Sequence, residues 1–314
     1  MAISTPLQLG ASVATADIAR RITGRKTDLK SGLFQGLLLA TLLASLVILI
    51  TLVVTTVQDG WPVLSERLGD FVTSGPDTSN AAVAGIWAGI KGTLTTSVIV
   101  AIVAFPLGIA CAVYLEEYAK GSRFARWTQI NIRNLAGVPS IVYGLLGLSI
   151  FVKSLDFATG GTTVIAAGLT LAVLVLPIVV ITATEALRAV PQGIREGAFG
   201  VGATRWEMVR HHVLPSAAPG ILTGTVLSLA RAAGEAAPVL LVGAKTGLLT
   251  TGNQDFFEQL RGGFTALPAQ IYAYARVGGD FPAVTAAASV VLIALVFLVN
   301  ALAIWLRNRY EQKW

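Results

Sequence analysis

The stretch that decides the fold is EALRAVPQGIREGAFGVGATRWEMVRHHVLPSAAP, residues 185–219. It separates two long apolar runs, Thr163–Ala183 and Gly220–Val242, and its many charges place it outside the bilayer. Its apolar residues recur with helical spacing. They are Ile194, Ala198, Val201, Trp206, Val209 and Val213. The pattern predicts two short helices separated by Gly202, with Leu214-Pro215 ending the second. Such a surface suits a soluble partner; an ordinary amphipathic loop is the alternative.

The composition is that of an all-α integral membrane protein. The 314 residues are 54% hydrophobic and 13% charged, whereas soluble domains are about 25% charged. Six apolar segments are long enough to cross a hydrocarbon core of about 30 Å as helices. They are Leu33–Val57, Gly92–Leu115, Leu135–Val152, Thr163–Ala183, Gly220–Val242 and Ala283–Leu306. We expect an arm over residues 1–32, a six-helix transmembrane domain over 33–306 and a tail over 307–314, with the first span retained as an anchor.

The formal net charge of +6 is distributed unevenly. If the spans alternate, most basic residues gather on one side, which includes both termini and the loop at 185–219. They are Arg20, Arg21, Arg25, Lys26, Lys30, Lys120, Arg123, Arg126, Arg133, Arg188, Arg195, Arg205, Arg210, Arg307, Arg309 and Lys313. By the positive-inside rule this side is cytoplasmic, and a prokaryotic plasma membrane is the expected location. Because the charge orients the protein, we expect membrane lipid and no nucleic acid as a partner.

The fifth apolar segment carries two charges, Arg231 and Glu235, near its middle. Arg231 lies roughly 16 Å into the segment, close to the midplane of a bilayer. A charge there costs about 2.5–3.5 kcal/mol on insertion scales, which marks it as a candidate functional residue. One interpretation is a simple ion pair along one helix face. The other is an aqueous path in which the guanidinium attracts a tetrahedral oxyanion and Glu235 is its partner when the path is empty.

Other residues offer little chemistry. Cys111 is the only cysteine and lies in an apolar span, and the adjacent His211 and His212 point to different helix faces. The segment Gly243-Ala244-Lys245-Thr246-Gly247 lacks the spacing of a phosphate-binding loop. We therefore expect no catalytic residue, no metal site and no cofactor bound by this chain.

Three further segments have less specific patterns. Val13–Ile22 is either an amphipathic helix on the membrane surface or part of a disordered tail. The predicted outer loop Lys245–Asp280 contains aromatic residues that either plug an external mouth or anchor at the interface. Small residues in the third span predict close helix packing. They are Gly137, Ser140, Gly144 and Gly147.

The loop at 185–219 resembles the coupling loop of ABC-importer permeases. Glu196-Gly197-Ala198, then three residues and Gly202, then Leu214-Pro215 twelve residues later are similar to the E-A-A-x3-G…L-P motif. The resemblance implies that this loop docks into a cleft of an ATPase subunit. The implied coupling residues are Glu196, Gly197, Ala198, Gly202, Ala203, Thr204, Arg205, Trp206, Leu214 and Pro215. Two positions depart from the pattern: Gly197 replaces an alanine and His212 an isoleucine.

Two further motifs resemble the permeases of the phosphate-specific ABC importer, most closely the A-type (PstA-like). They are Arg231-Ala-Ala-Gly-Glu235-Ala-Ala-Pro238 and Gly137-Val-Pro-Ser-Ile-Val-Tyr-Gly144. The resemblance covers about residues 30–310 and implies a type I (MetI-like) bundle. It implies a homologous C-type permease, a dimeric phosphate-import ATPase that uses ATP and Mg²⁺, and an extracytoplasmic phosphate-binding protein as partners. It also places Arg231 and Glu235 on the translocation path.

These patterns predict a transport subunit of a phosphate importer and not an enzyme, with ATP hydrolysis in a separate chain. Two alternatives remain at this stage. One is a permease for sulfate or another oxyanion, since an arginine suits several such anions. The other is a self-contained channel or membrane scaffold, which would need no ATPase.

Overall fold

The computed structural model describes residues 29–244 and 262–310. Every regular element in these ranges is a helix, as predicted. The chain divides into two compact units, Met1–Thr55 and Thr56–Trp314. Unit 1 contains the first part of α2 (Leu29–Thr73), which is predominantly apolar. Its length and composition suit it to crossing a membrane.

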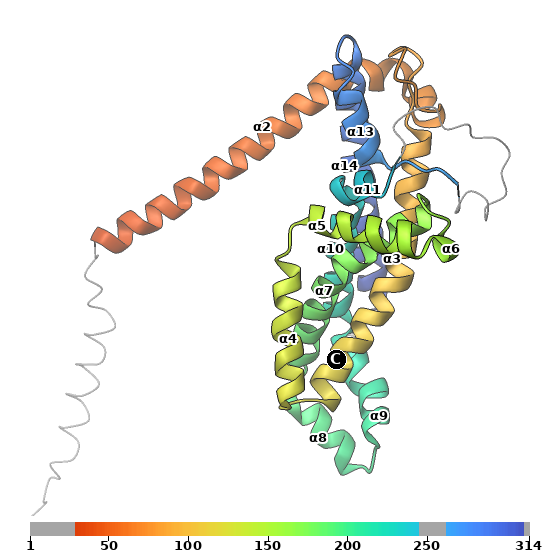
Figure 1. The fold of residues 1–314 in the computed structure, drawn as a ribbon. Helices are drawn as coiled ribbons and strands as arrows, with labels where there is room; N and C mark the ends of the chain where they lie inside the picture. The colour runs from red at the N-terminus through yellow and green to blue at the C-terminus, as the bar shows by residue number, and fades with distance from the viewer. Residues whose placement is uncertain (1–28, 245–261, 311–314) are drawn as a thin grey trace, which may run out of the picture. The chain divides into compact units, whose positions relative to one another are not determined.

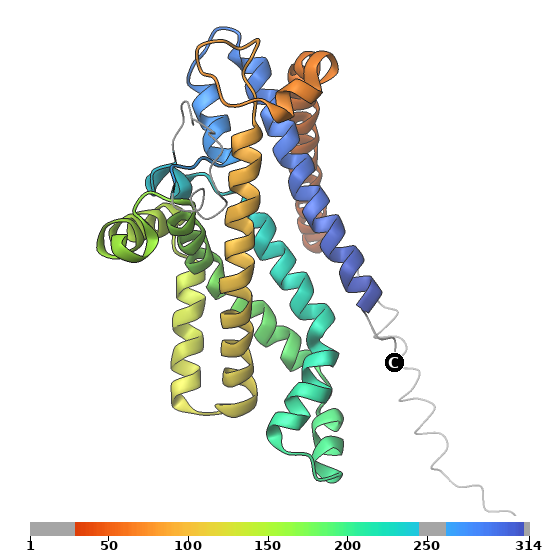
Figure 2. The ribbon, with the colours of Figure 1, turned by 90° about the vertical axis from the view of Figure 1, so that its right-hand side faces the viewer.

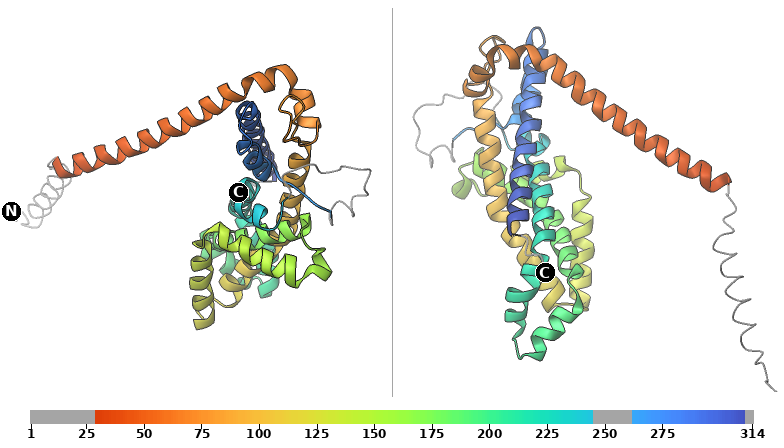
Figure 3. Two further views of the ribbon diagram at one scale, coloured as in Figure 1. Left: turned by 45° about the horizontal axis from the view of Figure 1, so that its top comes forward. Right: turned by 180° about the vertical axis from the view of Figure 1, so that it is seen from behind.

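Unit 2 is organised around four long helices. They are α3 (Trp87–Val113), α7 (Val164–Ala189), α10 (Leu214–Gly234) and α14 (Phe281–Tyr310). Helices α3 and α10 both pack against α7, and α14 lies beside α10 (Figures 1, 2 and 3). Gly108 of α3 lies against Val179 of α7, and a Cβ atom there would be 2.6 Å from the valine Cγ1. Small residues therefore allow the two backbones to approach closely.

The third predicted span, Leu135–Val152, is not one straight helix. The chain forms α4 (Arg123–Ala136), breaks, and continues as α5 (Ser140–Gly147) and the π-helical η2 (Leu148–Ser154), with a bend of 99° (Figure 1). Pro139, the residue before α5, has a non-helical backbone. A proline also disfavours helical backbone at the residue before it, so α4 does not continue into α5. A short α6 (Asp156–Thr159) follows. By length and composition, five helices in the described part of the chain could span a membrane, or six if this bent pair counts as one.

The fifth predicted span, Gly220–Val242, is also not one helix. α10 ends at Gly234, Glu235 has an extended backbone, and α11 (Ala237–Leu241) begins a new helix. Pro238 explains the break, because proline lacks an N–H and its ring clashes with the carbonyl group four residues earlier, here Gly234.

At one end of unit 2, α13 (Leu267–Ala275) packs against α3 and α14 (Figure 1). Gln270 Nε2 and Tyr274 Oη donate hydrogen bonds of 2.7 and 2.6 Å to the carbonyl oxygen of Gly85. α2 is kinked at Arg67, whose backbone is not helical. The predicted helix Val13–Ile22 and the loop segment 245–261, with Phe256 and Phe257, lie outside the described residues.

Candidate functional site: the loop between α7 and α10 and the break after α10

The loop between α7 and α10 forms the end of unit 2 opposite α13 (Figures 1 and 2). It contains α8 (Gln192–Gly200), α9 (Arg205–Met208) and the π-helical η3 (Val209–Val213). Gly202 separates α8 from α9, which confirms that part of the prediction. Its φ of +86° is left-handed, a conformation that glycine adopts without a Cβ clash. Ala203 N–H donates to the Ala198 carbonyl oxygen at 3.0 Å and closes the turn.

The prediction that Leu214-Pro215 ends the second short helix is wrong. α10 begins at Leu214, and helical backbone runs from η3 into it. Pro215 lies in the first turn of α10, where the backbone changes from π-helical to α-helical hydrogen bonding, and proline is tolerated in the first turn of an α-helix. The loop therefore joins the fifth span without a flexible link.

α9 begins with a capping box. Thr204 N–H donates to Glu207 Oε2 at 2.8 Å, and Glu207 N–H donates to Thr204 Oγ1 at 3.3 Å. The Thr204 N–H and the Thr204 hydroxyl both donate to Glu207 Oε2 at 2.8 Å, and these two bonds hold the pKa of the Glu207 carboxyl below its usual value. The backbone N–H groups of Thr204 and Glu207, which have no carbonyl partner within the helix, are thereby hydrogen-bonded.

The loop has an inner and an outer face. Its inner face consists of buried residues that belong to a hydrophobic cluster with the ends of α3 and α7. They are Ala198, Met208, Val209 and Val213. Phe199, Val201 and Trp206 on the outer face are exposed, with Val201 at 85%. Most of the predicted coupling residues are exposed, among them Glu196, Gly197, Gly202 and Arg205, whereas Ala198 is buried.

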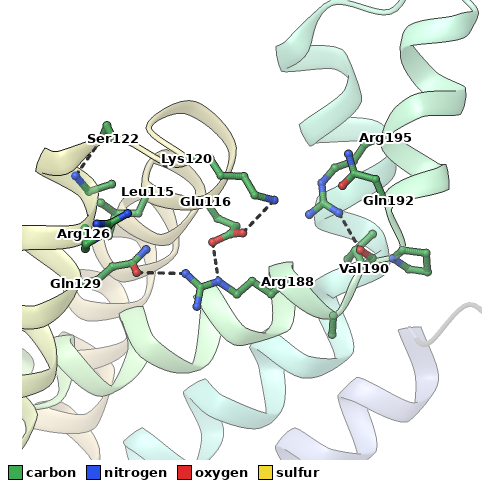
Figure 4. A pocket seen from close by; sticks show the side chains of 14 residues that line it. Leu115, Glu116, Lys120, Ser122, Arg126, Gln129, Arg188, Val190, Gln192 and Arg195 are labelled. Atoms are coloured by element: carbon green, nitrogen blue, oxygen red, sulfur yellow. Dashed lines mark hydrogen bonds and ion pairs between the residues drawn. The ribbon is translucent and has the colours of Figure 1, made fainter.

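A pocket of about 670 Å³ lies between the start of α4 and the start of α8 (Figure 4). Glu116 accepts a hydrogen bond of 2.8 Å from Arg188 Nε and forms an ion pair of 3.4 Å with Lys120. Gln129 Oε1 accepts from Arg188 Nη2 at 3.2 Å. Lys120 and Arg188 are therefore engaged within the chain.

Arg195, which also lines this pocket, pairs with Glu117 of the π-helical η1 (Tyr114–Tyr118), which follows α3. The shortest contact is 2.7 Å, and the two side chains are only 7% and 5% exposed. Neither residue was predicted from the sequence to belong to the site. The available signals were the position of Arg195 directly before Glu196 and the pair of acids ending the second span.

Arg231 and Glu235 also form an ion pair, but their side chains are more exposed than those of Arg195 and Glu117. Arg231 Nε is 3.4 Å from Glu235 Oε1, and their side chains are 48% and 20% exposed. Arg231 is in the last turn of α10, whereas Glu235 follows its end. The pair therefore spans a helix break and does not run along a continuous helix.

The helix break after Gly234 brings together two sequence motifs, Arg231–Pro238 and Gly137–Gly144. α11 packs against α5, where a Cβ atom on Gly144 would be 2.8 Å from Pro238 Cα. A side chain at residue 144 would thus displace the segment that follows Arg231 and Glu235. Among the described residues, no group of three or more His, Cys, Asp or Glu side chains could hold a metal ion.

Comparison with known proteins identifies relatives. Residues 104–313 match the family described as "Binding-protein-dependent transport system inner membrane component". The chain is 36% identical over 232 residues to "Phosphate transport system permease protein PstA 1" of Mycobacterium tuberculosis, covering 71% of this chain and 70% of that protein. It is 35% identical over 258 residues to "Phosphate transport system permease protein PstA" of Yersinia pestis, covering 79% and 80%.

A solved structure shares the fold. It is described as a bacterial ABC transporter involved in the import of the acidic polysaccharide alginate; the TM-score is 0.62 and the identity 19%, covering 91% of this chain and 99% of that chain. The predicted fold class, an all-α MetI-like ABC-importer permease, is confirmed.

Proposed function

Because this chain belongs to the family of inner membrane components of binding-protein-dependent transport systems, we propose that it is a permease subunit of an ATP-driven importer of inorganic phosphate. The names of its relatives support phosphate as the cargo. The observation that carries the proposal is Arg231 at a helix break, half exposed and held by one long contact to Glu235.

In this proposal Arg231 lies on the translocation path. A guanidinium offers parallel donors that match two oxygens of a tetrahedral oxyanion. Among the described residues, the contact of 3.4 Å to Glu235 uses only Nε, and the remaining donors of the fork are available for cargo. Glu235 neutralises the arginine when the path is empty and yields to the anion when it is filled. Because the side chain is not sealed within this chain, a homologous C-type permease completes the path.

The outer face of the loop between α7 and α10 is the proposed docking surface for a dimeric ATPase that binds ATP and Mg²⁺. Exposed Phe199, Val201 and Trp206 would fill its cleft, while the buried inner face keeps the loop attached to the bundle. Leu214 and Pro215 pass its motion into α10. An extracytoplasmic phosphate-binding protein delivers cargo on the opposite side, and both termini face the cytoplasm.

Arg231→Gln tests the path directly in proteoliposomes that contain the assembled complex. Hydrogen bonds to charged groups contribute about 1.5–3 kcal/mol, so phosphate uptake should fall by about tenfold or more. Arg123→Gln, at the exposed start of α4, is the matched control and should keep wild-type uptake. Undiminished uptake by the Arg231→Gln complex contradicts the path. Sulfate uptake equal to phosphate uptake identifies a general oxyanion permease, and uptake without ATPase identifies a channel.

A further inference from the structure

The guanidinium of Arg195 connects three elements at the loop end of unit 2. Its Nε lies 3.2 and 3.3 Å from the two carboxylate oxygens of Glu117, and its Nη2 lies 2.7 Å from Oε1. This fork-to-carboxylate arrangement is the strong form of an arginine ion pair. It ties α8 to η1 and so to the end of α3.

The same side chain also caps α7. Nη1 donates to the Val190 carbonyl oxygen at 2.8 Å, and Nη2 donates to the Leu187 carbonyl oxygen at 2.9 Å. α7 ends at Ala189, so these two carbonyl groups lie at its C-terminal end. A cation is favourable at this end of a helix, where carbonyl groups lack partners.

The surroundings keep the arrangement rigid. The Arg195 and Glu117 side chains are buried beside the hydrophobic cluster that contains Leu115, Leu187 and Ala198. Arg188 and Glu116 make a second link nearby, but the Arg188 side chain is 42% exposed. Within the part of the chain that the structure describes, it donates to the Glu116 and Gln129 side chains and to no backbone carbonyl group. Water can therefore replace the Arg188 contact more easily than the Arg195 contacts.

We propose that Arg195 is a positioning residue that makes α8 and the loop ends of α3 and α7 move as one body. This inference rests on the proposed function. A displacement of α8 by the ATPase would then reach α3 and α7 directly, and through α7 also α10, which carries Arg231. The loop would therefore move three spans, α3, α7 and α10, although it is covalently connected only to α7 and α10.

The test measures phosphate taken up per ATP hydrolysed by the assembled complex in proteoliposomes. In the Arg195→Gln complex this ratio should fall about tenfold, within the range typical of coupling between distant sites. Arg195→Lys should be intermediate, because an ammonium can pair with Glu117 but cannot also reach both carbonyl groups. Arg188→Gln is the matched control, and its ratio should stay within about twofold of wild type.

A purely structural role gives a different result. It would lower the amount of assembled complex and leave the ratio unchanged, which overturns the proposal. If Arg195→Gln does not assemble, the double variant Arg195→Met/Glu117→Leu removes both charges and leaves no unpaired buried ion. The assembled double variant should remain uncoupled. A wild-type ratio in it also overturns the proposal.

A second readout separates this inference from the cargo assignment. Hydrogen exchange is compared with and without ATP in complexes that are given no phosphate. In wild type, ATP should change exchange in α8, in Tyr114–Tyr118 and near Leu187; in Arg195→Gln the change should be confined to α8. Identical changes in both complexes refute the connection, whereas failure of wild-type phosphate uptake alone refutes only the proposed function.

Discussion

Two arginine–glutamate pairs in this permease are built in opposite ways. Arg195 and Glu117 are buried and lie 78 residues apart in the sequence, and the Arg195 guanidinium also donates hydrogen bonds to two backbone carbonyl groups. Arg231 and Glu235 are four residues apart, partly exposed, and joined by one contact of 3.4 Å. The first arrangement has few ways to rearrange without leaving a buried charge unpaired. The second can exchange its partner for an incoming anion, so similar residues serve rigidity at one site and reversible binding at the other.

The largest expected difference between the pairs is in stability. Glu117→Ala leaves the buried Arg195 charge without its carboxylate, which should lower the free energy of unfolding by about 3–5 kcal/mol. Glu235→Ala should lower it by no more than about 1 kcal/mol, because solvent screens the half-exposed Arg231. Denaturant titration of the two variants in detergent micelles measures both values. Equal losses would remove the contrast between the two sites.

A second prediction concerns the packing around the helix break. Gly144→Leu would place a side chain where its Cβ lies 2.7 Å from Leu241 Cδ1 and 2.8 Å from Pro238 Cα. Overpacking of this kind costs about 1–3 kcal/mol, and it should also reduce phosphate uptake by moving α11 relative to Arg231. Gly137→Ala is the matched control, since its Cβ would be at an ordinary 3.5 Å from the Asn134 carbonyl oxygen. Wild-type uptake by Gly144→Leu would show that the break does not depend on this close contact.

The third prediction tests the docking surface next to Arg195. Gly202→Trp forces a bulky residue into a left-handed backbone, at a cost of about 1–2 kcal/mol, and adds bulk to the exposed tip. Recovery of the ATPase with the purified permease should fall by about tenfold. Gly197→Ala is the control, because residue 197 is helical, has open space around it and matches the alanine of the motif. ATPase recovery at the wild-type level with Gly202→Trp would place the docking surface elsewhere.

Hydropathy predicted which segments form long apolar helices but not where these helices break. Pro106 and Pro177 lie inside α3 and α7, which continue through them, whereas Pro139 and Pro238 lie just after breaks. A proline alone therefore does not predict a break. At Pro238, the nearby Gly234 lowers the helical preference further, and this combination was visible in the sequence.

In the loop between α7 and α10, too, the sequence predicted some features and not others. Local spacing was sufficient to predict two short helices around Gly202, because glycine at a turn acts through its own backbone. Leu214-Pro215 was read as an end, although a proline is equally compatible with the first turn of a helix. The Arg195–Glu117 pair could not be predicted from local patterns, because its partners become neighbours only when α3 and α7 pack together.

The smallest expected effect comes from Glu207, the exposed carboxylate of the capping box that begins α9. Its pKa is lowered by hydrogen bonds from Thr204, so its contribution to stability is present above its usual pKa of 4.5 and is lost as the pH falls through the lowered value. Hydrogen exchange at the Thr204 amide, corrected for the intrinsic rate, should be slower in wild type than in Glu207→Ala at neutral pH, and the difference should vanish in acid. A difference that persists in acid would mean that packing of α9, and not the ionised cap, protects this amide.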